Sequence, residues 1–215
     1  MTSSRPVILV LAGVNGAGKS SVAGALLHER GQTWFNPDSY SRKLMLEGFS
    51  KEEADSAAWL HGKRQLEAAL ANGTDYAFET TLGGSTIARL LTRLAETHDV
   101  FMIFVGLSSP EMHIHRVKIR VEAGGHDIPE EKIRQRWDGS RRNLIAILPH
   151  LAMLQVFDNS DEGRVGQPAP PPTLLLEMRQ CRILYPPPND LVALERTPAW
   201  ARSIVETALR QAETP

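Results

Sequence analysis

Short apolar runs alternate along this chain with amphipathic segments of helical length. Four of the runs are almost wholly apolar, as strands buried in a parallel sheet are: Val7–Ala12, Tyr76–Glu79, Val100–Val105 and Met153–Phe157. The segments between them carry helix start and stop signals. This alternation predicts an α/β fold, in which helices flank a parallel sheet.

The remaining elements follow from turn and capping signals. Ser50 and Glu53 form a capping box, which predicts a helix that begins there and ends at Asn72-Gly73. Other helices are expected over Lys19 to about Glu29, Ser85 to Thr97, Pro110 to Glu122, Pro129 to Leu148 and Pro198 to Gln211. A short strand is expected over Thr33–Asn36, an exposed loop over 161–172, and a hairpin or edge strands over Thr173–Met178 and Arg182–Tyr185.

Composition limits the function classes. The chain has 215 residues, which suits one α/β domain over 1–215, with a helical lid at about 110–148 and a C-terminal extension at about 161–215. Its net charge of −1 counts against a dedicated nucleic-acid binder. The single cysteine, Cys181, excludes an intrachain disulfide and is expected to be a small buried residue of a reducing, cytoplasmic protein. No segment is long enough to span a membrane, and the apolar run at the N-terminus leads into a loop rather than a cleavage site.

The segment Gly13–Ser20 carries the strongest chemical signal. It matches the pattern G-x-x-x-x-G-K-[ST] at every fixed position and lies between a predicted buried strand and a predicted helix. Glycines at these positions let successive backbone N–H groups point at phosphate oxygens, and the following helix directs its N-terminus at the same group. The chain is therefore expected to bind ATP with Mg²⁺ through Gly13, Val14, Asn15, Gly16, Ala17, Gly18, Lys19, Ser20 and Ser21. Lys19 would contact the β- and γ-phosphates, and Ser20 would be the metal ligand.

Acidic residues follow two of the predicted strands. Asp38 comes just after the strand at 33–36, and Glu79 ends the next one, so both are expected at the carboxyl edge of the sheet, where ligands bind. Asp38 is the candidate base for a substrate hydroxyl, and a helix N-cap is the alternative. Glu79, with Thr80 and Thr81 beside it, is expected to contact the acceptor or the metal, and a structural hydrogen bond to the loop is the alternative. Asp158-Asn159-Ser160 is expected to form a turn near the adenine.

Arginines cluster on the two predicted helices that flank Gly124-Gly125-His126. Two helices joined by a glycine hinge, with arginines on one side, suit a lid that closes over a transferring phosphoryl group. Of the six arginines on these helices, Arg120, Arg134 and Arg136 are preferred as catalytic residues, and the alternative is a solvated charged face. His126 is expected to be structural or to lie behind the residues that contact substrate.

Four blocks in this order resemble the zeta toxin family of P-loop kinases: residues 12–21, 35–38, 78–82 and 120–129 with Arg134 and Arg136. The resemblance covers about residues 6–160. It implies a kinase that phosphorylates the 3′-hydroxyl of UDP-N-acetylglucosamine and is held inactive by an antitoxin protein. It also implies that Lys19 is the P-loop lysine, Asp38 the base and Glu79 a sugar contact, and that two of the three preferred arginines belong to the lid.

The residues leave several functions open. A kinase of another small metabolite or an antibiotic would use the same parts, and a non-catalytic ATP-binding regulatory module would lack the base or the lid. A nucleic-acid end kinase would show a basic channel with interleaved aromatic residues, which this chain lacks. No base-reading motif distinguishes ATP from GTP. The sequence therefore predicts a P-loop phosphotransferase for a small hydroxyl compound.

Overall fold

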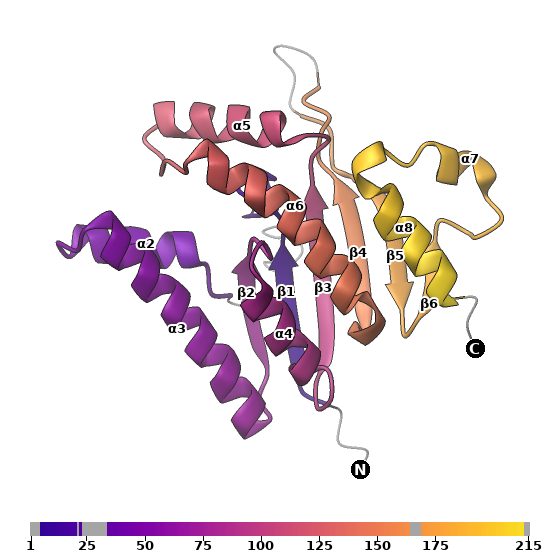
Figure 1. The fold of residues 1–215 in the computed structure, drawn as a ribbon, viewed down its shortest axis with the longest axis horizontal. Coiled ribbons are helices and arrows are strands. Elements are labelled where there is room, and N and C mark those ends of the chain that lie inside the picture. The colour runs from indigo at the N-terminus through magenta and orange to yellow at the C-terminus, as the bar shows by residue number, and fades with distance from the viewer. Residues whose placement is uncertain (1–4, 21, 23–33, 164–168, 213–215) are drawn as a thin grey trace.

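A single six-stranded sheet forms the centre of the molecule (Figure 1). The computed structural model describes residues 5–20, 22, 34–163 and 169–212. The strand order is β2-β1-β3-β4-β5-β6. The parallel strands are β1 (Val7–Ala12), β2 (Tyr76–Thr80), β3 (Asp99–Gly106) and β4 (Met153–Asp158). The antiparallel strands β5 (Thr173–Arg179) and β6 (Arg182–Tyr185) extend one edge, so the predicted hairpin is part of the same sheet.

The strand predicted at Thr33–Asn36 is much shorter than expected. Thr33 lies outside the described residues, and of the rest only Phe35 pairs, through one parallel bridge to Phe78. Its amide donates to the Ala77 carbonyl at 2.9 Å, and its carbonyl accepts from the Glu79 amide at 2.8 Å. Pro37 has no N–H to donate and starts a helix, which ends the pairing after one residue. The bridge nevertheless directs the chain to the predicted edge of the sheet.

Seven α-helices flank the sheet in the described part of the chain. They are α2 (Pro37–Leu46), α3 (Lys51–Asn72), α4 (Ser85–Leu94), α5 (Pro110–Glu122), α6 (Glu130–Ile147), α7 (Leu191–Glu195) and α8 (Ala199–Ala212). A 3₁₀ turn, η1 (Leu148–His150), follows α6. The sequence did not predict the short α7, and the helix expected from Lys19 to Glu29 lies mostly outside the described residues.

The helix ends follow the local chemistry of the sequence. Ser50 and Glu53 make both hydrogen bonds of the predicted capping box, and Gly73 ends α3 with a left-handed φ of 62°. At the start of α2 the N-cap is Asn36, whose side chain accepts from the Ser39 amide at 3.0 Å. Asp38 therefore lies in the first turn and is not the cap, so the capping alternative for this residue is wrong.

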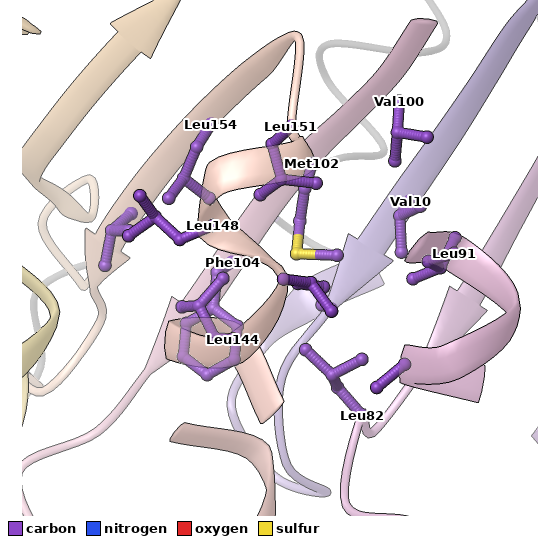
Figure 2. Packing of buried hydrophobic residues seen from close by; sticks show 14 of the residues in the cluster. Val10, Leu82, Leu91, Val100, Met102, Phe104, Leu144, Leu148, Leu151 and Leu154 are labelled. Atoms are coloured by element: carbon purple, nitrogen blue, oxygen red, sulfur yellow. The ribbon is translucent and has the colours of Figure 1, made fainter. Parts of the chain in front are cut away.

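The main core lies between the sheet and the helices α4, α6 and α8, which cover the same face in Figure 1. Figure 2 shows Leu91 of α4 and Leu144 of α6 packed near Val10, Met102 and Phe104 of the central strands. Each fully buried side chain of this size stabilises the fold by about 1.5–3 kcal/mol. The carboxyl-terminal half of α6 is thus fixed to the sheet by its buried residues.

A smaller cluster lies under the predicted lid. Val14 of the loop packs with Ile114 and Val117 of α5 and with Ile128 and Ile133 at the start of α6. Figure 1 shows α5 and the start of α6 at the end of the sheet toward which β1 and β3 point. These contacts place α5, the turn at 123–129 and the first turns of α6 next to the loop, while the lid at about 110–148 stays a prediction.

Cys181 is exposed, which corrects the expectation that it is buried. It follows Gln180 in the tight turn between β5 and β6, where both residues have positive φ, as a two-residue hairpin requires. No helix of the described residues is long and apolar enough to cross a membrane.

Candidate active site

The loop after β1 has the shape that phosphate binding requires. Gly13, Gly16 and Gly18 have φ values of 145°, 82° and 82°, a region that residues with a Cβ rarely adopt. The Val22 amide donates to the Gly18 carbonyl at 3.1 Å, so a helical turn begins directly after the last glycine. The backbone N–H groups of loop and turn can therefore converge on an anion. Ser21 lies outside the described residues.

Lys19 and Glu79 form a buried ion pair at the end of this loop. Lys19 Nζ lies 3.3 Å from Glu79 Oε1, and the two side chains are only 7% and 9% exposed. Lys19 Nζ also donates to the Val14 carbonyl at 3.4 Å. The other carboxylate oxygen of Glu79 accepts from Asn36 Nδ2 at 2.7 Å and from Ser20 Oγ at 3.3 Å. The structural alternative for Glu79, a hydrogen bond that its carboxylate accepts from the loop, is thus present.

A cavity of about 210 Å³ opens from the loop toward α2 and α3, and it is called the inner cavity below. It brings together seven of the predicted site residues, of which five are Asn15, Lys19, Asp38, Glu79 and Arg136. Thr80 and Thr81 also line it. Within the described residues, the Asp38 carboxylate has no hydrogen bond or ion pair. Asp38 is thus a carboxylate whose oxygens are available to a ligand.

Arg136 joins the lid to the phosphate-binding loop. Its Nη1 donates to Asn15 Oδ1 at 2.7 Å. Burial lowers the pKa of the Arg136 guanidinium, and the nearby carboxylates of Asp38 and Asp55 act in the opposite direction. An arginine keeps its charge even so, because its ordinary pKa lies far above neutral pH. The cavity therefore contains a half-buried cation that interacts electrostatically with the free carboxylate of Asp38.

Of the three preferred arginines, Arg136 lines the inner cavity, and Arg120 and Arg134 do not. Arg120 Nη2 donates to the His126 carbonyl at 2.9 Å, which stabilises the turn between α5 and α6. Arg134 Nη1 pairs with Glu111 at 2.6 Å on the exposed side of the lid. Positions 134 and 136 are two apart on one helix, so their side chains cannot face the same cavity.

Thr80 and Thr81 shape the turn after β2. Thr80 Oγ1 accepts from the Leu82 amide at 3.0 Å, and Thr81 Oγ1 accepts from the Gly83 amide at 3.4 Å. The Thr80 carbonyl accepts from the Gly13 amide at 3.1 Å, which ties this turn to the loop. Both threonines therefore have a structural task in addition to their place on the cavity wall.

A second hollow lies on the other side of the loop. It has a volume of about 520 Å³ and is lined by Gly16, Gly18, Arg116, Asn159 and the prolines 170–172, among others. Asn159 Nδ2 donates to the Ala17 carbonyl at 2.8 Å, and Arg116 Nε pairs with Glu162 at 3.1 Å. The turn at 158–160 thus lies beside the loop, where the sequence predicts the nucleoside.

Sequence reasoning missed several residues of the inner cavity wall, among them Asp55, Trp59 and Lys132. Asp55 Oδ1 accepts from Ser41 Oγ at 2.6 Å, and its Oδ2 lies 3.6 Å from His126 Nε2. His126 itself lines the inner cavity, and the structural role expected for it stays a prediction. Asp55 and Trp59 are four apart on α3, so the helix period indicates that they share a face, but not that this face turns toward the site.

His113 of α5 is a buried group beneath the loop. Its Nδ1 lies 2.8 Å from the Asn15 carbonyl, which can only accept, so the neutral ring donates from this nitrogen. Burial lowers the pKa of His113 from 6.5 to about 4, against the raising effect of the bond to Asn15. The charges of Lys19 and Arg116 lower it further. The neutral imidazole of His113 therefore holds the Asn15 carbonyl in place.

This predicts a loss of stability in mild acid. His113 binds a proton below pH 6.5 in the unfolded chain, but only near pH 4 in the folded chain. The neutral His113 therefore makes its full contribution to the free energy of unfolding above pH 6.5, and this contribution falls as the pH drops from 6.5 toward 4. At pH 5 the loss is about 2 kcal/mol. Urea unfolding of the wild type and of His113→Gln at pH 7 and 5 measures it. Parallel changes in the two proteins would contradict the prediction, because glutamine does not titrate.

Fold and loop together define a P-loop protein with a kinase-like α/β fold. The chain belongs to the AAA domain family (AAA_33), whose model matches residues 8–143. An uncharacterized protein of Haemophilus influenzae is 25% identical over 126 residues, which cover 58% of this chain and 88% of that protein.

Solved structures share the fold at low sequence identity. A chain in the crystal structure of AvrRxo1-ORF1:-ORF2 with ATP has a TM-score of 0.62 and 16% identity, over 84% of this chain. This chain spans only 60% of the length of that one. A chain from the PezAT toxin-antitoxin system of Streptococcus pneumoniae has a TM-score of 0.51 and 14% identity, over 73% of this chain and 69% of that one.

Proposed function

We propose that this protein is an ATP-dependent phosphotransferase that phosphorylates a hydroxyl group of a small molecule. One observation carries the proposal: the inner cavity combines the loop lysine, the free carboxylate of Asp38 and the half-buried guanidinium of Arg136. The cavity thus contains both cationic side chains that can bind the phosphoryl group and a carboxylate that can accept the hydroxyl proton. A non-catalytic ATP-binding module would not need this combination.

The residues of the loop fit ATP with Mg²⁺. When bound, ATP·Mg²⁺ supplies the phosphoryl group that is transferred. The glycine loop offers backbone N–H groups to the phosphates, and Lys19 can exchange the Val14 carbonyl for phosphate oxygens. Within the described residues no three His, Cys, Asp or Glu side chains form a metal site. The Ser20 hydroxyl, near Glu79, would therefore be the chain's ligand to a metal that prefers oxygen and retains water.

Asp38 and Arg136 carry the acceptor side of the mechanism. Asp38 would accept the proton of the substrate hydroxyl through a carboxylate oxygen, while the hydroxyl oxygen forms its bond to the γ-phosphorus, the bond from this phosphorus to the bridging oxygen breaks, and ADP leaves. Arg136 stabilises the negative charge of the phosphoryl oxygens, held in place by its hydrogen bond to Asn15. The lid over the cavity excludes water, which protects the phosphoryl group from hydrolysis.

The more specific proposal is that the acceptor is a UDP-N-acetylamino sugar, such as UDP-N-acetylglucosamine. It is supported by the resemblance of four sequence blocks to zeta toxins and by the shared fold with a chain of the PezAT toxin-antitoxin system. The same observations support an antitoxin protein as a partner. The second candidate function is a kinase of another small metabolite or of an antibiotic, and the small volume of the inner cavity supports it.

Mass spectrometry tests the reaction directly. We expect ATP and UDP-N-acetylglucosamine to yield a singly phosphorylated UDP-sugar with the wild type and none with Lys19→Ala. Loss of the lysine ammonium removes its contacts to the transferring group. Circular dichroism and ATP binding of each variant verify that it is folded. If the wild type binds ATP·Mg²⁺ and forms no product, the UDP-sugar is the wrong acceptor, and a panel of metabolites and antibiotics is then the test of phosphotransfer.

A further inference from the structure

The inner cavity continues outward into a wider cleft between α3 and the turn that joins α5 to α6. This outer cleft has a volume of about 610 Å³. It shares five lining residues with the inner cavity: Asp55, Trp59, Ile128, Lys132 and Arg136. The inner cavity, at about 210 Å³, is below the roughly 300–1,000 Å³ of pockets that enclose a drug-sized ligand. An acceptor larger than one sugar ring therefore has to extend into the outer cleft.

Trp59 stands at the junction of the two spaces with its ring half exposed. It is 49% exposed, although it lines both cavities. No aromatic ring or cation stacks on it within the described residues, whereas Trp137 carries the guanidinium of Arg141. An exposed indole beside a polar cavity is a surface on which a flat ring can stack.

Lys132 is the second feature of this junction. Lys132 lines both cavities, and its ammonium has no hydrogen bond or ion pair within the part of the chain that the structure describes. The rim also carries the carboxylates of Glu52 and Asp127, and Lys51 is already bound to the Asp127 carbonyl at 2.7 Å. The cleft is therefore close to neutral, and Lys132 offers a local charge rather than a broad positive field.

We propose that the outer cleft is the ring-binding half of the acceptor site. Trp59 stacks on a planar ring of nucleobase size, Lys132 binds an anionic group that links this ring to the rest of the acceptor, and the hydroxyl-bearing end lies in the inner cavity. The inference rests on the proposed function, because it takes the inner cavity as the place of transfer. It defines the acceptor as a two-part molecule and makes Trp59 the residue that selects for its ring.

Binding measurements test the cleft independently of the reaction. The full chain is first saturated with Mg²⁺ and a non-hydrolysable ATP analogue, so that the loop is filled. Calorimetry then measures the affinity for UDP-N-acetylglucosamine, uridine and N-acetylglucosamine. We expect Trp59→Ala to weaken UDP-N-acetylglucosamine and uridine at least tenfold and to leave N-acetylglucosamine unchanged. Trp59→Phe keeps most of the affinity, and Lys132→Met weakens the UDP-sugar but not uridine.

Leu60→Ala is the matched control, because Leu60 adjoins Trp59 on α3, is 38% exposed and lines neither cavity. Equal uridine affinity in the wild type and Trp59→Ala, or no binding of uridine and the UDP-sugar by the wild type, overturns the inference. Transfer to N-acetylglucosamine without any effect of Trp59 overturns it while the proposed function stands. If ring binding depends on Trp59 but no acceptor is phosphorylated, the proposed function fails while the ring-binding role of the outer cleft stands.

Discussion

Replacing Asp38 by asparagine is expected to lower the rate of phosphoryl transfer by about 10²–10⁴, the contribution typical of a positioned general base. The reason is that asparagine keeps the shape of the side chain but cannot take up the proton of the substrate hydroxyl. The fold should not suffer, because within the described residues the Asp38 carboxylate makes no hydrogen bond or ion pair. Single-turnover phosphorylation and thermal unfolding of the two proteins measure both effects.

Asp55 provides the matched control within the same cavity. Its carboxylate is already engaged by Ser41 and faces His126, so Asp55→Asn should lose stability and retain most of the rate. Comparing the two variants thus distinguishes the role of Asp38 as a base from a general effect of negative charge near Arg136. Retention of more than a tenth of the rate by Asp38→Asn, or an equal loss in Asp55→Asn, would reject Asp38 as the base.

The parts of the site that the sequence predicted are those that local chemistry determines. The loop is set by its own glycines, and the strands by their apolar runs. Asp38 reaches the carboxyl edge because Phe35 pairs with Phe78 and Pro37 starts a helix at once. These features depend on neighbours within a few residues or on the general rule for parallel sheets. The fold class and the place of the cavity were therefore predictable.

The lid arginines show what the sequence could not predict. Helix period alone excludes Arg134 and Arg136 as partners in one cavity, but it does not say which of them faces inward. The rotation of α6 is fixed by Ile133, Leu144 and Ile147, which are buried against distant elements. That rotation brings Arg136 to Asn15, 121 residues away along the chain. Trp59 and Lys132 escaped notice for the same reason, because the helices that carry them meet only in the folded molecule.

Replacing Gly139 by alanine is expected to destabilise the protein by about 3 kcal/mol or more, although alanine is the better helix former by about 1 kcal/mol. Gly139 lies buried in α6 where this helix crosses the turn after β2. A Cβ at this position would lie far inside van der Waals contact of the Gly83 carbonyl oxygen. Because the opposing atom belongs to the backbone, no side-chain rotation relieves the overlap, and the helix has to move away from the turn.

The same displacement should reduce transfer more than tenfold, because Arg136 is one turn from Gly139 and its Cα packs against Gly83. Gly84→Ala is the control, since a Cβ there meets nothing within 4 Å. Its expected cost is below about 1 kcal/mol, with normal transfer. Urea unfolding and single-turnover rates of both variants decide the matter. If Gly139→Ala were as stable and active as the wild type, the Gly83–Gly139 crossing would not be what positions Arg136 against the loop.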